Sequence, residues 1–258
     1  MSVVKLVSYS QIPNTNVVTD TNGVTDTNVV TDTNVVTDTN GVTDTNVVTD
    51  TNGVTCIPNN LQDIVAYCAR VSNPANQNNT VTNEKLIRYL IKNAHWSPLE
   101  MVSVCLEIET TRDIARQILR HRSFSFQEFS QRYAVVDLGF TPKEARTQDK
   151  KNRQNSIETT DETLKTEWEN KQLELVDKVK DIYDWALENG IAKEQARAVL
   201  PEGMTKSRMY MNGTLRSWVH YIQLRSANGT QKEHQDVALA CAEVIKTIFP
   251  MIMDLIEK

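Results

Sequence analysis

A tandem hexapeptide repeat near the N-terminus limits how this chain can fold. Each copy reads Asn-Val-Val-Thr-Asp-Thr or Asn-Gly-Val-Thr-Asp-Thr, and six full copies run from Asn16 to Thr51 before a seventh decays at 52–55. A period of six is compatible with a parallel β-helix, with a plain hairpin, or with an insertion that loops out of the fold. Because each copy offers only one or two apolar side chains to bury, we expect an inserted and largely mobile segment at 16–55.

The remainder of the chain is suited to one domain, which we assign to residues 1–258 with the repeat inserted. The net charge is −5, and the six repeat aspartates supply −6, so the rest is close to neutral. This balance argues against general nucleic-acid or anionic-membrane binding. No apolar run has the length of a membrane span, and the N-terminus lacks the apolar core of a secretory signal.

The cysteines point to a reducing compartment. They are scattered along the chain, with neither paired metal-ligand spacing nor a disulfide framework, at Cys56, Cys68, Cys105 and Cys241. We therefore expect reduced thiols, no metal site and a cytoplasmic location.

Strand and helix patterns alternate outside the repeat and predict an α+β fold. Val3–Tyr9 and Met101–Glu109 read as strands, and Val102, Val104, Leu106 and Ile108 share one face of the second. Amphipathic periodicity and capping residues predict helices at Asn60–Val71, Asn83–Ala94, Ser156–Glu188, Lys193–Leu200, Thr214–Ala227 and Gln231–Phe249.

The stretch from Arg120 to Tyr133 concentrates hydrogen-bonding side chains between aromatic ones. Thr111 is expected to cap a helix that carries a basic stripe of Arg112, Arg116 and Arg120 and ends near His121. Cations at a helix C-terminus have a structural explanation, because the helix dipole favours them there. The dipole does not explain the polar residues that follow, so we favour a site for an anionic ligand, which arginine binds with two prongs.

Arg120-His121-Arg122, followed by seven residues and then Ser130, resembles the signature of the flavin-dependent thymidylate synthases, the ThyX family. The segments 95–100, 195–201 and 215–225 resemble three further motifs of that family in the same order. The resemblance implies a mostly antiparallel sheet packed with helices. It also implies methylation of dUMP to dTMP with 5,10-methylenetetrahydrofolate as carbon donor, FAD as hydride carrier and NADPH as reductant. A homotetramer with active sites shared between subunits is implied as well.

The resemblance assigns roles to individual residues. Arg225 is the expected catalytic residue, where it would stabilise negative charge on the uracil ring. The expected FAD contacts are Ser97, Arg120, His121, Arg122, Glu128, Thr214, Arg216 and His220. The expected dUMP contacts are Gln117, Arg120, Glu128, Phe129, Ser130, Gln131, Arg132, Arg197 and Arg225.

The last of these motifs has two polar stripes on one helix. Arg216, His220 and Gln223 form the stripe assigned to FAD, and Trp218, Tyr221 and Arg225 form the stripe assigned to dUMP. Thr214 departs from the asparagine usual in the family, and His220 from the asparagine of some relatives. His95 is expected near the flavin or folate, and His234 at the surface or in a helix cap.

Other functions remain as alternatives. Ser130 could be a hydrolase nucleophile, but no Gly-x-Ser-x-Gly elbow surrounds it. A covalent thymidylate synthase route needs an activated cysteine, and Cys105 and Cys241 lie at apolar periodic positions. A flavoprotein scaffold without turnover and a repeat-driven assembly or adhesion protein are the remaining alternatives.

Overall fold

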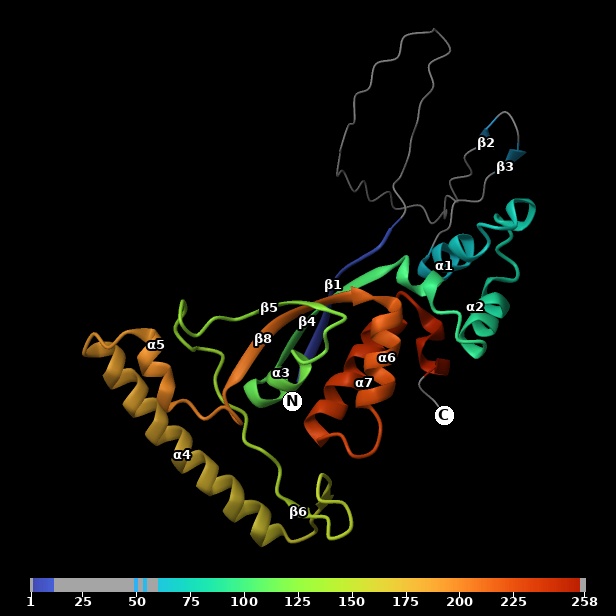
Figure 1. Ribbon diagram of the computed structural model, residues 1–258. Helices are drawn as coiled ribbons and strands as arrows, with labels where there is room; N and C mark the ends of the chain where they lie inside the picture. The colour runs from blue at the N-terminus through green and yellow to red at the C-terminus, as the bar shows by residue number, and fades with distance from the viewer. Residues whose placement is uncertain (1, 12–48, 51–52, 55–59, 256–258) are drawn as a thin grey trace, which may run out of the picture.

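A four-stranded antiparallel sheet is the centre of the fold (Figure 1). The computed structural model describes residues 2–11, 49–50, 53–54 and 60–255. The strands follow the order β1-β4-β8-β5, with β1 at Val3–Tyr9, β4 at Ser103–Thr111, β8 at Lys206–Thr214 and β5 at Ser125–Glu128. Every neighbouring pair is antiparallel, as the family resemblance implied.

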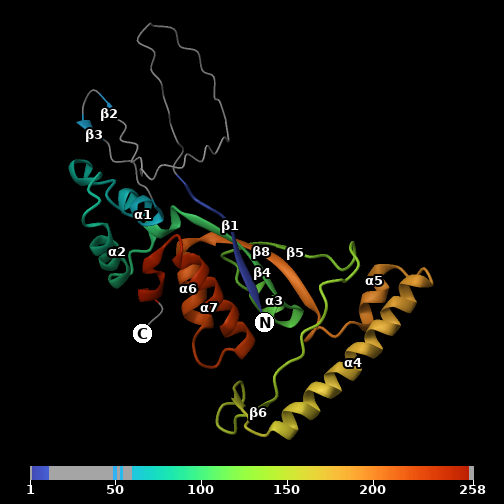
Figure 2. The same ribbon diagram turned by 180° about the vertical axis from the view of Figure 1, so that it is seen from behind.

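The two faces of the sheet differ in polarity. On one face, Leu106 and Ile108 of β4 and Met209 and Met211 of β8 are fully buried. Helices α6 (Leu215–Arg225) and α7 (Lys232–Lys246) cover this face, as Figures 1 and 2 show. On the other face the side chains are polar, and they form the ion pairs Lys5–Glu107 and Arg208–Glu109.

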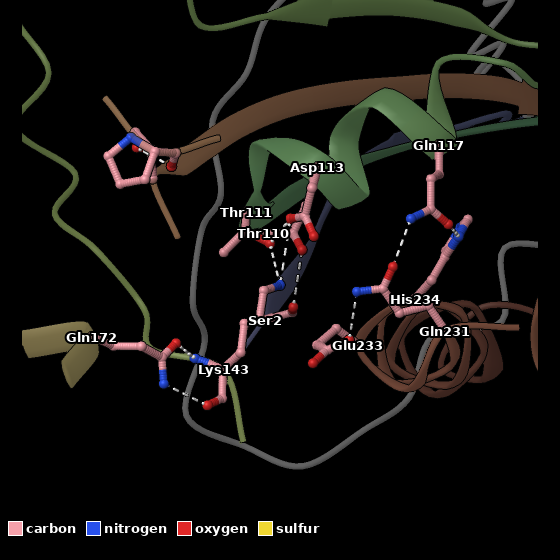
Figure 3. A network of polar contacts seen from close by, with 12 residues as sticks. Ser2, Thr110, Thr111, Asp113, Gln117, Lys143, Gln172, Gln231, Glu233 and His234 are labelled. Atoms are coloured by element: carbon pink, nitrogen blue, oxygen red, sulfur yellow. Dashed lines mark hydrogen bonds and ion pairs between the residues drawn. The ribbon is translucent and has the colours of Figure 1, made fainter. Parts of the chain in front are cut away.

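Short helices complete the body of the fold. They are α1 (Leu61–Ala69), η1 (Pro74–Asn76), α2 (Asn83–Lys92), η2 (Ser97–Glu100), α3 (Arg112–Ile118) and η4 (Pro250–Leu255). Helix α3 follows β4 directly, so the residues at its C-terminal end face the first turn of α7 (Figure 3).

A long helical arm extends from the sheet on the side away from α6 (Figures 1 and 2). It consists of the hairpin β6 (Arg146–Gln148) and β7 (Ser156–Glu158), then α4 (Glu162–Glu188), α5 (Lys193–Ala196) and η3 (Arg197–Val199). Large apolar side chains of α4 are exposed at Leu164, Trp168, Leu173, Leu175, Ile182 and Trp185. No helix in the described ranges combines the length and apolarity needed to cross a membrane.

Most predicted elements are confirmed, with shifted ends. The strand at Val3–Tyr9 has the predicted bounds, and each predicted helix contains an observed one. The predicted helix at Ser156–Glu188 begins too early, because 156–158 pair with β6 and Asp161 caps α4 by accepting a bond from Leu164 N. Strands β5 and β8 were not predicted.

The repeat lies largely outside the described residues. Within it, β2 (Thr49–Asp50) pairs antiparallel with β3 (Gly53–Val54). The predicted inserted segment at 16–55 stays a prediction.

Candidate functional site

The turn between α3 and β5 presents two cations to solvent. Helix α3 ends at Ile118, whose carbonyl accepts a hydrogen bond from His121 N at 3.0 Å. Arg120 and Arg122 on either side of that histidine are exposed, whereas His121 is half-buried. The turn can therefore offer two guanidinium groups to an anionic ligand.

His121 connects this turn to helix α6. Arg225 donates a hydrogen bond from Nε to Nε2 of His121 at 2.9 Å. Burial lowers the pKa of His121 to about 4, and the nearby charges of Arg225, His220 and Arg120 add to the effect. His121 is therefore neutral at physiological pH, with Nε2 as an acceptor and the proton on Nδ1.

A groove of about 420 Å³ runs along the side of α6 that carries Arg216 and His220. It is lined by Trp96, Glu100, Ser123, Arg216, Ser217, His220 and Gln223. The FAD stripe predicted from the sequence therefore borders one continuous groove. Arg216 forms an ion pair with Glu100, and Ser97 is exposed at the start of the adjoining η2.

Thr214 has a structural role at the N-terminus of α6. It is the N-cap residue, and its Oγ1 accepts a hydrogen bond from Ser217 N at 3.3 Å. A hydroxyl in place of the family's usual asparagine therefore still satisfies a free backbone N–H of the first turn.

The predicted dUMP stripe on α6 is mostly core, which corrects the sequence interpretation. Trp218 and Tyr221 are fully buried, and the Trp218 indole N–H donates to the Val104 carbonyl at 2.9 Å. They cannot reach a bound nucleotide, so Arg225 alone of this stripe is available. A tryptophan and a tyrosine in a polar motif are large enough to fill the space between helix and sheet, and here they do.

The basic stripe predicted on α3 is also corrected. Arg112 is buried, and Arg112 and Arg116 both pair with Glu128, at 3.5 and 3.4 Å. Ser207 Oγ donates to the same carboxylate at 2.9 Å. Glu128 therefore fastens β5 to α3 and β8. Arg116 and Arg120 are both exposed, and Arg120 is not part of this ion-pair cluster.

The loop after β5 carries several of the predicted dUMP contacts. Phe129 is half-buried, and its N–H donates to the Arg208 carbonyl at 2.9 Å, which holds the start of the loop. Ser130 is exposed, while Gln131 is buried and its Nε2 has no hydrogen-bond partner among the described residues. A buried amide N–H without a partner is costly, and a phosphate oxygen is a group that would satisfy it.

Helix α5 and η3 bring a further arginine to this loop. Arg132 pairs with the Glu194 carboxylate at 3.4 Å, and Arg197 Nε donates to the Glu194 backbone carbonyl at 3.3 Å. Arg132, Ser130 and Arg197 thus belong to one region, although they are distant in sequence. This region and α6 lie at opposite ends of the sheet in both ribbon views (Figures 1 and 2).

Gln117 and His234 form a contact that the sequence interpretation missed. His234 is fully buried, so its predicted place at the surface or in a cap is wrong. Its Nδ1 lies 3.3 Å from Gln117 Oε1, and its Nε2 lies 3.2 Å from the Tyr221 hydroxyl. The spacing from His234 to Val237, Ala238 and Cys241 follows the apolar face of α7, and this signal could have revealed its burial.

Cysteine chemistry finds no support at this site. Burial raises the pKa of the Cys105 and Cys241 thiols, so neither is an activated nucleophile.

Comparison with known proteins gives a consistent result. A family model described as thymidylate synthase complementing protein matches residues 55–251. A probable flavin-dependent thymidylate synthase of Paramecium bursaria Chlorella virus 1 is 51% identical over 194 residues, which are 75% of this chain and 89% of the relative. A flavin-dependent thymidylate synthase of Synechocystis sp. is 47% identical over 200 residues, covering 78% and 91%.

Solved structures agree with these sequence matches. The UMP/dUMP methylase PolB of Streptomyces cacaoi, bound with 5-Br dUMP, superposes with a TM-score of 0.67 at 27% identity. The superposition covers 75% of this chain and 89% of PolB.

Proposed function

The chain belongs to the flavin-dependent thymidylate synthase family, and from this premise we propose how its residues share the reaction. The activity is the flavin-dependent methylation of dUMP to dTMP. In the proposed balance, the uracil C5 proton is lost and the methylene carbon of 5,10-methylenetetrahydrofolate becomes bonded to C5. The bonds from this carbon to the folate nitrogens break, and tetrahydrofolate leaves. The bound flavin would supply the hydride that completes the methyl group, with NADPH as the source of its electrons.

We propose that FAD binds in the groove beside α6 and against the turn after α3. Arg216, His220 and Ser97 would hold its polar groups from the groove, and Arg120 and Arg122 would meet its phosphates from the turn. The chemistry that this cofactor supplies when bound is the hydride. Thr214 and His121 would border the same space, the former through its position at the α6 N-cap and the latter through its remaining N–H.

Arg225 is the proposed catalytic residue, and its bond to His121 is the observation that carries the proposal. Because His121 Nε2 accepts from Arg225 Nε, this bond leaves the two terminal nitrogens of the guanidinium for an anion, as far as the described residues show. A guanidinium fixed beside the uracil edge would stabilise negative charge on the ring, which makes C5 more nucleophilic.

The loop after β5 is the proposed phosphate site of dUMP. Ser130, Arg132 and Arg197 supply a hydroxyl and two cations. The Gln131 amide, which has no hydrogen-bond partner among the described residues, supplies an N–H donor. Phe129 and Glu128 would hold this loop from the β5 side, and Glu128 is already fixed by two arginines. Gln117 and Arg225 would contact the nucleotide from the C-terminal ends of α3 and α6.

The groove beside α6 and the loop after β5 are separated within one chain, so we propose that a homotetramer completes each site. The exposed apolar side chains of α4 support this assembly, because large exposed apolar surfaces mark contacts between proteins. We propose that the protein acts in the cytoplasm.

The test begins with the purified full chain. It should be yellow, and its reduced flavin should be reoxidised under anaerobic conditions only when dUMP and 5,10-methylenetetrahydrofolate are both present. A colourless protein that does not take up FAD would contradict the proposal. A flavoprotein that binds dUMP but forms no dTMP would instead support the scaffold alternative.

A further inference from the structure

A directional chain of hydrogen bonds connects the first turn of α7 to Gln117 on α3 (Figure 3). Gln117 Nε2 donates to Gln231 Oε1 at 2.8 Å, and Gln231 Nε2 donates to Glu233 Oε2 at 2.9 Å. At its other end, Gln117 Oε1 lies 3.3 Å from Nδ1 of the buried His234. Gln117 is therefore held at both atoms of its amide.

The Glu233 carboxylate sets the direction of this chain. A carboxylate only accepts hydrogen bonds, so the Gln231 amide must turn its nitrogen toward Glu233 and its oxygen toward Gln117. Gln117 must then donate to Gln231, which leaves its oxygen facing His234. His234 Nδ1 must consequently carry the proton.

The position of the His234 proton also determines how this ring bonds to Tyr221. With the proton on Nδ1, Nε2 of His234 is an acceptor, and the Tyr221 hydroxyl 3.2 Å away is its donor. Burial lowers the pKa of His234 to about 3, with smaller effects from Arg225 and His121, so the neutral ring is the stable form. Every polar atom of the buried imidazole thus has a partner of the required type.

The same series of hydrogen bonds also supports the part of the proposed site around His121 and Arg225. The Tyr221 ring packs edge-on against His121 at a centroid distance of 4.9 Å, and His121 accepts the hydrogen bond from Arg225. His234 therefore lies behind both Gln117 and His121, two residues of the proposed site, and has no exposed surface itself.

We propose that His234 is a positioning residue that fixes the amide orientation of Gln117, so that Gln117 presents an N–H donor to the nucleotide. Gln231 accepts one of the two N–H groups of the Gln117 amide. The orientation of the amide also fixes the direction of the second N–H, which we assign to the nucleotide. Without the His234 N–H, the Gln117 amide is held only by its bond to Gln231, and the direction of its second N–H is less firmly fixed. This inference rests on the proposed role of Gln117 as a dUMP contact.

His234→Phe tests the proposal by removing both hydrogen bonds while a ring still fills the space. We expect KM for dUMP to rise about tenfold, the scale of one lost orienting hydrogen bond, while kcat stays within about twofold. Flavin content per subunit and Tm are measured in parallel, because a purely structural role would change these and leave KM unaltered.

Two further variants keep the test decisive if His234→Phe fails to fold. Tyr221→Phe removes only the donor to His234, and Glu233→Gln removes the group that sets the direction of the chain. Each should raise KM for dUMP about threefold at unchanged flavin content. Glu243→Gln is the matched control, since it makes the same change on the outer face of α7, and should leave KM unchanged.

The outcomes separate this inference from the proposed function. An unaltered KM in all three variants, or an equal rise in Glu243→Gln, would overturn the role of His234 while the wild type still forms dTMP. Absence of dTMP formation by the wild type would instead contradict the function itself.

Discussion

Arg225 and His121 are joined by a hydrogen bond in which the guanidinium Nε donates to the imidazole Nε2 at 2.9 Å. The bond holds the planar guanidinium in one orientation. It requires a neutral Nε2, which burial of His121 and the charge of Arg225 favour by lowering the pKa of the histidine. It also joins the end of α6 to the turn after α3, which are far apart in sequence. The catalytic proposal depends on this geometry.

Replacing Arg225 should impair dTMP formation without preventing flavin binding. We expect Arg225→Ala to lower kcat/KM by about a hundredfold or more, the scale seen when one charge-stabilising donor is removed from an active site. Arg225→Lys should recover only part of the activity, because lysine lacks the planar fork. Steady-state dTMP formation and bound flavin per subunit are the measurements.

Arg208→Ala is the matched control for this experiment. Arg208 pairs with Glu109 on the polar face of the sheet, away from the groove and the turn. Comparable losses in both variants would show that Arg225 acts through folding and would count against its catalytic role.

Stability should fall as the pH falls below about 6.5. The folded-state pKa values of His121 and His234 lie at about 4 and about 3, below the ordinary value. Between these values and 6.5 the unfolded chain binds protons that the folded chain does not, so acid favours unfolding. Each group can contribute at most about 1.4 kcal/mol per pH unit in this window, and less where it is partly solvated.

Urea unfolding at about pH 5 and pH 7.5 measures this dependence. The His234→Phe variant, which cannot take up the proton, should show a smaller loss of stability between the two conditions. An identical loss in wild type and variant would refute the assignment of a depressed pKa to His234.

Gly213 should not tolerate a side chain. A Cβ at this position in β8 would lie 2.4 Å from Cδ1 of the buried Phe124 ring. Gly213→Ala should therefore lower the free energy of unfolding by about 1–3 kcal/mol, the usual cost of overpacking a core. Gly203→Ala is the control, because a Cβ there meets no atom within 4 Å.

A double variant tests the cause. Phe124→Leu should reduce the additional cost of Gly213→Ala, and the coupling between the two changes can be measured by equilibrium unfolding. Strictly additive effects would mean that the alanine clashes with something other than this ring.

Charged substitutions on α4 should disrupt the proposed homotetramer. Leu175 and Trp185 are exposed apolar residues of this helix, with exposures of 48% and 58%. Leu175→Glu combined with Trp185→Glu should produce smaller assemblies in light scattering and a loss of dTMP formation. Lys178→Glu places the same side chain on the same helix at an exposed polar position and should leave the assembly intact.

Removal of residues 16–51 should leave dTMP synthesis largely intact. The family match starts at residue 55, and the residues proposed for the site all lie after it. The deletion must keep β1, because its backbone pairs with β4 along the edge of the sheet. Loss of activity with the assembly preserved would show that the repeat contributes to the site, whereas a deletion that also removes β1 should be destabilising in any case.

The strongly periodic parts of the fold were predictable from the sequence. Val104, Leu106 and Ile108 alternate along β4 and are buried as expected, since only one face of the strand meets the helices. Strand β8 escaped prediction because two of its inward positions are Ser207 and Gly213, which carry no apolar signal. Its burial depends on neighbours that only the folded chain provides.

The sequence indicated which residues belong to the candidate site better than it indicated which of them contact one another. Arg216 and His220 border one groove, as their spacing on a helix requires. The pairing of Glu128 with Arg112 and Arg116 was not predictable, because it brings together residues from different elements. The burial of His234 was misjudged because a polar side chain was given more weight than its position on the apolar face of α7.

The packing of Phe124 against Gly213 has a consequence for motion during turnover. Phe124 belongs to the turn that carries Arg120 and Arg122, and Gly213 directly precedes the Thr214 cap of the helix that carries Arg216. The ring also meets Trp218 edge-on at 4.9 Å, so turn, strand and helix share one rigid contact. We therefore expect the two walls that would hold the flavin to move as a single body. Opening or closing of the site is then expected on the nucleotide side, where the apolar cluster of the neighbouring arm has three buried residues, Tyr183, Ala186 and Ala196.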